Sequence, residues 1–156
     1  MRLNLCLLVF ILLLSSSATG QAKIGIHAAM SEYMGLQTEL SLEASVYKNF
    51  SLAIRGSYGL RNSFQYRGGI RYSPRLFGKT RLRLGADFGS YVYRYSLNES
   101  FRIHGKIRGL SLGLEQGIGE RWAIQAELSN LEYFEDEYKS NISGGIHLGV
   151  IYKISK

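Results

Sequence analysis

The sequence has very little cysteine, which cross-links small exported domains, and very little proline, which interrupts paired strands. Cysteine and proline each occur once among its 156 residues. Cys6 lies within an N-terminal apolar run, so the rest of the chain has no cysteine for a disulfide bond, on which small soluble exported domains often depend. Pro74 is the single residue that lacks a backbone N–H, so long paired strands are allowed on both sides of it.

Long hydrophobic runs and blocks of basic residues are also missing. The apolar run from Leu3 to Leu14 is shorter than the ~20 residues of a spanning helix. It follows Arg2 and precedes small residues at positions 15–20, which is the order of a secretory signal peptide. We therefore expect residues 1–20 to be a cleaved signal peptide, with an uncleaved anchor as the alternative, and residues 21–156 to form one domain. The net charge of +7 comes without a basic block or a recognition helix, so nucleic-acid binding is not expected.

What the sequence does contain is alternation with a period of two. In residues 36–46 and again in residues 50–60, apolar side chains occupy one parity and mostly polar or small side chains the other. This pattern predicts two β-strands rather than a helix. Val46 and Phe50 share a face and are expected to pair. That pairing leaves Tyr47-Lys48-Asn49 as a three-residue loop, whose last residue is expected to take the left-handed backbone conformation.

Further segments alternate in the same way, and eight strands are expected in all. They cover residues 24–30, 36–46, 50–60, 64–72, 82–92, 103–115, 122–129 and 146–152. No helical pattern separates them, so neighbours in the chain should pair antiparallel, and the even number returns both termini to one side. The sixth strand changes phase, because Ile103 and Ile107 lie on the opposite parity from Leu110. A bulge near Arg108-Gly109, or an exit from the membrane, would explain this change.

The composition of the two parities indicates which face lies inside. The polar parity is rich in glycine, serine and alanine, and aromatic residues of the apolar parity lie towards strand ends, as in the interfacial girdles of a membrane barrel. An arginine that faces lipid near the bilayer midplane costs ~2–4 kcal/mol, so the charged residues are expected to face the lumen. We expect a nearly balanced ion-pair network there, made of Glu39, Glu43, Asp87, Glu115 and Glu127 with Arg55, Arg67, Arg71, Arg81 and Arg83.

The sequence therefore predicts an all-β protein, an eight-stranded antiparallel up-and-down transmembrane β-barrel with a polar lumen. A barrel of this size encloses little more than its own side chains, so the lumen should be a plug of ion pairs and the protein no general porin. A soluble lipocalin-like carrier, which has an apolar lumen and a charged exterior, shows the same period and stays the alternative.

This pattern of eight alternating strands behind a signal peptide resembles the small eight-stranded outer-membrane proteins of the OmpA transmembrane-domain and OmpX type. The resemblance covers essentially all of Gln21 to Lys156. It implies a Gram-negative outer-membrane protein that contacts membrane lipids including lipopolysaccharide and is a monomer. Because such barrels keep short turns in the periplasm and longer loops outside, the loop lengths predict that both termini are periplasmic. It also implies a non-enzymatic structural or surface-interaction role such as adhesion, without a cofactor.

Few residues suggest chemistry. His27 and His147 lie on the polar parity of strands that become neighbours on barrel closure, but no third ligand is spaced to join them in a metal site, so a hydrogen-bonding role in the lumen is favoured. The lipid A deacylases carry a His-x-Ser-Asn motif on a late strand. Glu127-Leu128-Ser129-Asn130 is similar to it only at Ser129 and Asn130. A serine without a nearby base is weak evidence for a nucleophile, so such an enzyme is a minor alternative.

The fifth and sixth strands form the longest hairpin, and its excess length is expected to project outside the cell. It carries Tyr91, Tyr93, Tyr95, Phe101 and Arg102, and tyrosine and arginine are enriched where proteins meet partners. We expect these residues to be a surface for an extracellular protein partner. The equal alternative is that the three tyrosines only form the outer aromatic girdle and a lid on the lumen.

Overall fold

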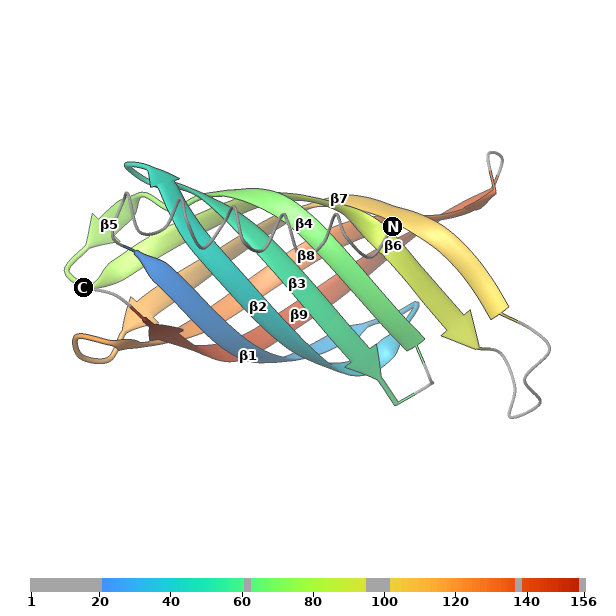
Figure 1. The fold of residues 1–156 in the computed structure, drawn as a ribbon, viewed down its shortest axis with the longest axis horizontal. Coiled ribbons are helices and arrows are strands. Elements are labelled where there is room, and N and C mark those ends of the chain that lie inside the picture. Colours follow the sequence, from blue (N-terminus) through green and yellow to red (C-terminus); the bar gives the residue numbers. More distant parts are fainter. Residues whose placement is uncertain (1–20, 61–62, 95–101, 137–138, 155–156) are drawn as a thin grey trace.

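The computed structural model describes residues 21–60, 63–94, 102–136 and 139–154, and within them the chain is built of strands and their connections (Figure 1). The strands are β1 (Ala22–Ser31), β2 (Gly35–Tyr47), β3 (Phe50–Gly59), β4 (Ser63–Tyr72), β5 (Arg75–Phe77), β6 (Thr80–Arg94), β7 (Arg102–Gly117), β8 (Trp122–Asp136) and β9 (Lys139–Lys153). No helix in these ranges is long and apolar enough to cross a membrane. The expected signal peptide, residues 1–20, lies outside the described residues.

Eight long strands close into a barrel in which each pairs antiparallel with its two neighbours. β1 pairs with β2 and with β9, and β4 pairs with β6 to complete the ring. The short β5 lies beside the start of β6, in the turn that contains Pro74. The prediction of a closed eight-stranded antiparallel barrel is confirmed, and β5 is an addition that the alternation did not indicate.

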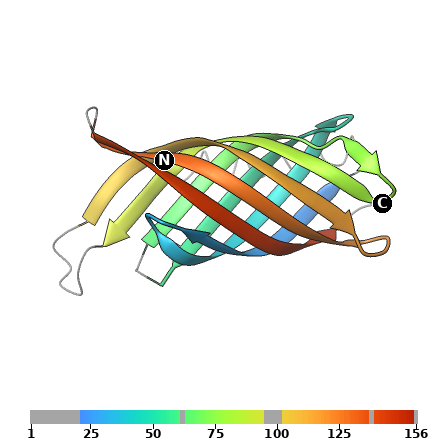
Figure 2. The ribbon, with the colours of Figure 1, turned by 180° about the vertical axis from the view of Figure 1, so that it is seen from behind.

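The strands are strongly staggered around this ring. Following paired residues from Ile24 of β1 through every strand leads to Ile142 of β9, whereas the partner of Ile24 on β9 is Tyr152, ten residues further on. Such a stagger tilts the strands steeply, as Figures 1 and 2 show. As a result, residues that face each other across the lumen come from strands that are far apart in sequence.

The two ends of the barrel differ, and each is named here by what it carries. The termini end holds the start of β1, the end of β9 and the tight connections β2–β3 and β7–β8. The hairpin end holds the β6–β7 and β8–β9 connections, where pairing continues to Arg94 with Arg102 and to Asp136 with Lys139. The β6–β7 and β8–β9 strand pairs extend well beyond the neighbouring strands at this end (Figure 1).

Three local predictions were wrong: the length of the β2–β3 loop, its left-handed residue, and the bulge that was one of two explanations for the phase change on β7. The β2–β3 loop has two residues rather than three, because a bulge between Ser45 and Tyr47 lets Tyr47, not Val46, pair with Phe50. Its left-handed residue is Lys48, with φ of 45°, and not Asn49. On β7 there is no bulge near Arg108-Gly109: the pairing with both β6 and β8 runs without a register shift.

The inside of the barrel is polar and the outside apolar. Nearly all of the fully buried bulky side chains at mid-barrel are polar or charged, while most of the large aliphatic residues on the long strands are exposed, as for Leu40 and Leu128. Aromatic residues ring the termini end, where Phe50 lies against Tyr72 and Trp122 against Tyr152. A lipocalin-like carrier needs the opposite polarity, so the soluble alternative is wrong, and the exterior is that of a membrane-spanning barrel.

Candidate functional site

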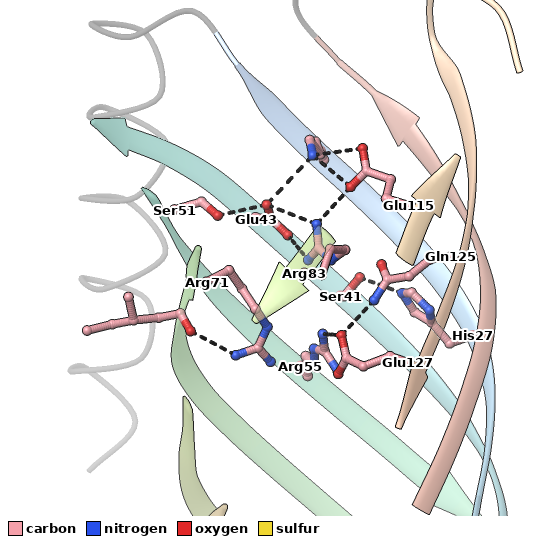
Figure 3. Close-up of polar contacts among 12 residues, drawn as sticks. His27, Ser41, Glu43, Ser51, Arg55, Arg71, Arg83, Glu115, Gln125 and Glu127 are labelled. Atoms are coloured by element: carbon pink, nitrogen blue, oxygen red, sulfur yellow. Dashed lines mark hydrogen bonds and ion pairs between the residues drawn. The ribbon is translucent and has the colours of Figure 1, made fainter. Parts of the chain in front are cut away.

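The lumen is the first candidate site, and its layer nearest the termini end is a closed ionic cluster. Lys23 Nζ donates to both carboxylate oxygens of Glu115 at 3.0 and 3.1 Å. Arg83 bridges the same carboxylate, at 2.8 Å, to Glu43, at 2.5 Å. Ser51 Oγ donates to Glu43 at 2.7 Å. Figure 3 shows Glu43, Ser51, Arg83 and Glu115, from β2, β3, β6 and β7, meeting at one level of the barrel.

A second ionic cluster fills the middle of the lumen. Arg55 of β3 donates from both terminal nitrogens to Glu127 of β8, at 2.6 and 2.8 Å, and approaches Glu39 of β2 at 3.4 Å. Arg67 of β4 is bonded to the other oxygen of Glu39. Gln125 donates to Glu127 at 2.7 Å, so Glu127 is held from two directions. Because β3 and β8 are not neighbours in the sheet, the Arg55–Glu127 pair spans the lumen.

A third ion pair, Arg71 with Asp87, joins the neighbouring strands β4 and β6 on their lumen side. Arg71 Nη2 lies 2.6 and 2.9 Å from the two oxygens of Asp87, and Nη1 donates to the Ile70 carbonyl at 3.1 Å. Glycines make room for this side chain. A Cβ on Gly85 would lie 2.6 Å from Arg71 Nη1, and one on Gly69 would lie 2.9 Å from the same atom. The small residues of the polar parity therefore serve the packing of the long ones.

The buried charges balance. Among the described residues, the buried charged side chains are five cations and five carboxylates: Lys23, Arg55, Arg67, Arg71 and Arg83 with Glu39, Glu43, Asp87, Glu115 and Glu127. The structure thus brings together nine of the ten residues expected in the network. It places Arg81 only half-buried at the termini end, with no ion pair recorded for it in the described ranges, and its expected place in the network was wrong. The fifth cation of the network is instead Lys23, which the sequence analysis did not include.

Above the ionic layers, towards the hairpin end, the lumen becomes apolar. Met34, Tyr91, Ile107, Leu131 and Tyr133 are each 2 % exposed or less and pack as one cluster, with Tyr33, Tyr93 and Ile103 against it. The Tyr33 and Tyr133 rings lie 4.7 Å apart, and Tyr91 meets Tyr133 edge-on at 5.2 Å. This aromatic cap explains the phase change of β7: Ile103 and Ile107 face inward like the polar residues below them, and only the polarity of the lumen has changed.

The cap also corrects the expected binding surface on the β6–β7 hairpin. Tyr91 is 1 % exposed and Tyr93 packs against the cap, so the two tyrosines point into the barrel and Tyr91 offers nothing to an external partner. Their positions match the equal alternative, a lid on the lumen, because β6 keeps its inward parity up to the hairpin end. Tyr95, Phe101 and the side chain of Arg102 lie outside the described residues.

Both lumen histidines are hydrogen-bonded to serines. His27 Nε2 lies 2.9 Å from Ser41 Oγ, and His147 Nε2 lies 2.9 Å from Ser129 Oγ (Figure 3 shows the first pair). His147 Nδ1 in turn lies 3.5 Å from Glu39. The statement that Ser129 lacks a nearby base was therefore wrong: the base comes from β9 across the β8–β9 pair. No group of three or more potential metal ligands occurs within the described ranges.

The Ser129–His147–Glu39 arrangement has the residue types of a nucleophile, a base and an orienting carboxylate. A substrate, however, has to reach the serine. Ser129 is 6 % and His147 3 % exposed, and the aromatic cap lies above them while the Arg55–Glu127 pair lies below. Glu39 is also engaged by two arginines. The hydrogen bond between Ser129 and His147 Nε2 satisfies two buried polar atoms, whereas His147 Nδ1 is buried without a hydrogen bond, 3.5 Å from Glu39.

The chain was compared with known protein families, sequences and solved structures. No protein-family model and no curated protein sequence matches the chain. Solved structures do match. The N-terminal β-barrel domain of Pseudomonas aeruginosa OprF superposes with a TM-score of 0.73 at 14% identity, over 86% of this chain and 98% of that one. Its fold is that of the small eight-stranded outer-membrane barrels.

Two further small barrels are similar to this chain. Neisserial surface protein A matches with a TM-score of 0.60 at 16% identity, over 86% of this chain and 95% of its own. The Yersinia pestis outer membrane protein Ail, in a phospholipid nanodisc, matches with a TM-score of 0.53 at 14% sequence identity, over 86% of this chain and 99% of its own. At these identities the likeness defines the fold, and the expected resemblance to OmpA-type and OmpX-type barrels is confirmed at that level.

Proposed function

We propose that this protein is a non-enzymatic outer-membrane barrel with a structural or surface-interaction role, and that it is not a general porin. The observation that carries the proposal is the filled lumen: ten balanced buried charges in ionic clusters, closed by an aromatic cap at the hairpin end. Solvated ions need an open, water-lined path, and side chains that pair with each other across the lumen occupy that path.

The apolar exterior and the fold of the solved neighbours support the outer-membrane location. Bacterial barrels of this class keep short turns in the periplasm and long connections outside. By that rule the termini end faces the periplasm and the hairpin end faces outward. The β6–β7 and β8–β9 hairpins then stand above the membrane and form the surface that meets an extracellular partner. Exposed His104 and Ile142 belong to the described part of that surface.

Cell fractionation tests the location, and gel migration tests the barrel. The protein should fractionate with outer membranes and migrate faster unheated than heated, because a closed barrel resists detergent until it is boiled. The same measurements on a variant with Glu127 and Arg55 both replaced by methionine should give the same location. Recovery of the wild-type chain in the soluble periplasmic fraction would refute the proposal.

A deacylase-like enzyme is the second candidate, favoured by one observation, the 2.9 Å contact of Ser129 with His147. Its test is the acylation pattern of lipid A in cells with and without the protein. We expect no difference, because the serine faces a closed lumen. Loss of an acyl chain that depends on Ser129 would favour the enzyme instead.

A further inference from the structure

The outward face of β7 changes from basic to apolar along its length. Read from the hairpin end, its exposed residues are His104, Lys106 and Arg108, followed by Leu110, Leu112 and Leu114. The outward positions paired with these three residues carry no cation: they are Phe88, Ser90 and Val92 on β6, and Glu132 and Phe134 on β8. Among the side chains that the structure describes, those of β7 form a row of three basic residues directly above a lipid-facing apolar row.

A furrow follows the same strand down the outside of the barrel. Three adjoining hollows make it up. The first, of about 310 Å³, contains Arg108, Asn130 and Leu110; the second, of about 260 Å³, shares Leu110 and Asn130 with it. The third, of about 430 Å³, shares Leu112 and Leu128 with the second. From Arg108 to Leu114 the furrow runs over six residues of strand, roughly 20 Å.

The furrow is a depression in the barrel surface because residues with small side chains lie between the leucines. Gly109 and Gly113 of β7 and Ala126 of β8 line it, and Leu112, Leu114, Leu128 and Ile146 form its sides. This lower part is almost wholly apolar and lies in the band of the barrel that faces lipid. A furrow of this length and chemistry suits an extended acyl chain.

At the polar end of the furrow, neighbouring side chains hold Arg108 in a fixed position. Arg108 Nε donates to Glu132 at 2.8 Å, and the guanidinium lies 4.6 Å from the centre of the Phe134 ring. No hydrogen bond from its two terminal nitrogens is recorded within the described ranges, and the side chain is 60% exposed. A guanidinium fixed by its Nε presents those two nitrogens in the geometry that a phosphate accepts. Lys106, two residues further out on the same face, extends the positive charge.

We propose that this furrow is a binding site for a phosphorylated lipid of the leaflet at the hairpin end, with one acyl chain along β7 and its phosphates on Arg108 and Lys106. The occupant is a lipid with more than one phosphate, of the lipid A type. A phospholipid has a single phosphate, which Arg108 alone would bind, whereas the basic row continues over Lys106 to His104. The inference rests on the proposed outer-membrane location, since that leaflet is where such a lipid occurs.

The test uses the purified full chain in nanodiscs of neutral phosphatidylcholine, to which lipid A or phosphatidylglycerol is added. Retained lipid is measured by native mass spectrometry. The variant Lys106→Gln/Arg108→Gln removes two surface cations at the site, and Lys48→Gln/Arg121→Gln removes two exposed cations at the termini end as the matched control. All four positions are solvent-facing, so both variants should keep heat-modifiable migration.

We expect the site variant to lose lipid A affinity by about thirtyfold, the effect of two interfacial cations, and the control by less than threefold. Ala126→Phe, which fills the furrow without changing charge, should also weaken lipid A binding. Unchanged lipid A affinity in the site variant would overturn the proposal, and so would an equal loss for phosphatidylglycerol, because that result indicates a single-phosphate ligand. The assay is independent of the cell, so a failed fractionation test and a failed lipid test are distinguishable.

Discussion

Removing one partner of the Arg55–Glu127 pair should destabilise the barrel severely. Glu127→Gln keeps the shape of the side chain but leaves the Arg55 guanidinium, 2% exposed, with only Glu39 as a carboxylate partner at 3.4 Å. The two hydrogen bonds to Glu127, at 2.6 and 2.8 Å, lose their charged acceptor: the glutamine oxygen can accept only one of them, and its NH2 group then faces the guanidinium. Breaking a buried pair from one side typically costs ~3–5 kcal/mol, which is a large share of a domain's ~5–15 kcal/mol stability.

Urea unfolding from lipid vesicles measures this loss. The chain has a single tryptophan, Trp122, on the lipid-facing surface at the termini end, so its fluorescence reports transfer from lipid to water. Arg108→Gln is the matched control, because it also removes an arginine from a carboxylate at 2.8 Å but at an exposed site. Such exposed pairs contribute only ~0–1 kcal/mol.

The double variant Arg55→Met/Glu127→Met separates a lost interaction from a buried unpaired charge. Replacing both partners by apolar groups of similar volume is often neutral or stabilising. We expect it to recover most of the stability that Glu127→Gln loses. If Glu127→Gln and Arg108→Gln both cost less than ~1 kcal/mol, the lumen pair is not buried as described and the reasoning fails.

Three further predictions follow from the same structure. Gly149→Ala should destabilise the barrel by ~1–3 kcal/mol in the same urea assay, because its Cβ would overlap the His27 ring, whereas Gly144→Ala, with open space around it, should not; equal effects would contradict the packing. A fluorophosphonate probe should not label Ser129 in the folded protein, since the serine is buried under the aromatic cap, and labelling that Ser129→Ala removes would contradict the closed lumen. Deleting residues 97–101 should leave heat-modifiable migration intact and abolish surface adhesion; an unchanged adhesion phenotype would exclude this hairpin as the partner surface.

The strands and the barrel could be predicted because they depend on local pattern. Alternation along residues 36–60 determines which side chains share a face, and the cost of an arginine in lipid determines which face is inside. Both arguments need only neighbours in the sequence. They therefore succeeded wherever a strand crosses the membrane.

The contacts could not be predicted because they depend on the stagger of the whole ring. Arg55 meets Glu127 across the lumen, and Ser129 meets His147 diagonally across two strands, only for this particular register. Arg81 and Lys23 share the inward parity, but Arg81 lies at the rim and Lys23 reaches Glu115. Which of them joins the network is a question of height along the barrel, and parity alone does not supply that height.

The hairpin end was misread for a different reason. Beyond the membrane the outside becomes polar, as with Lys106, and the inside becomes apolar, as with Ile107. A rule that equates polar with inward then fails, although the strand keeps its phase. The exchange of polarity on β7 is the sequence signal that could have located both the aromatic cap and the basic row above the furrow.

A planar-bilayer recording of the purified wild-type chain tests the central claim, a lumen closed by its own ion pairs and aromatic cap, most directly. We predict no stable open level in molar salt, because Arg55–Glu127, Arg83–Glu43 and the cap each cross the lumen. Tyr91→Ala alone should not create one, since the ionic layers below it stay in place. A persistent conductance comparable to that of a general porin, in the wild-type protein, would contradict the account.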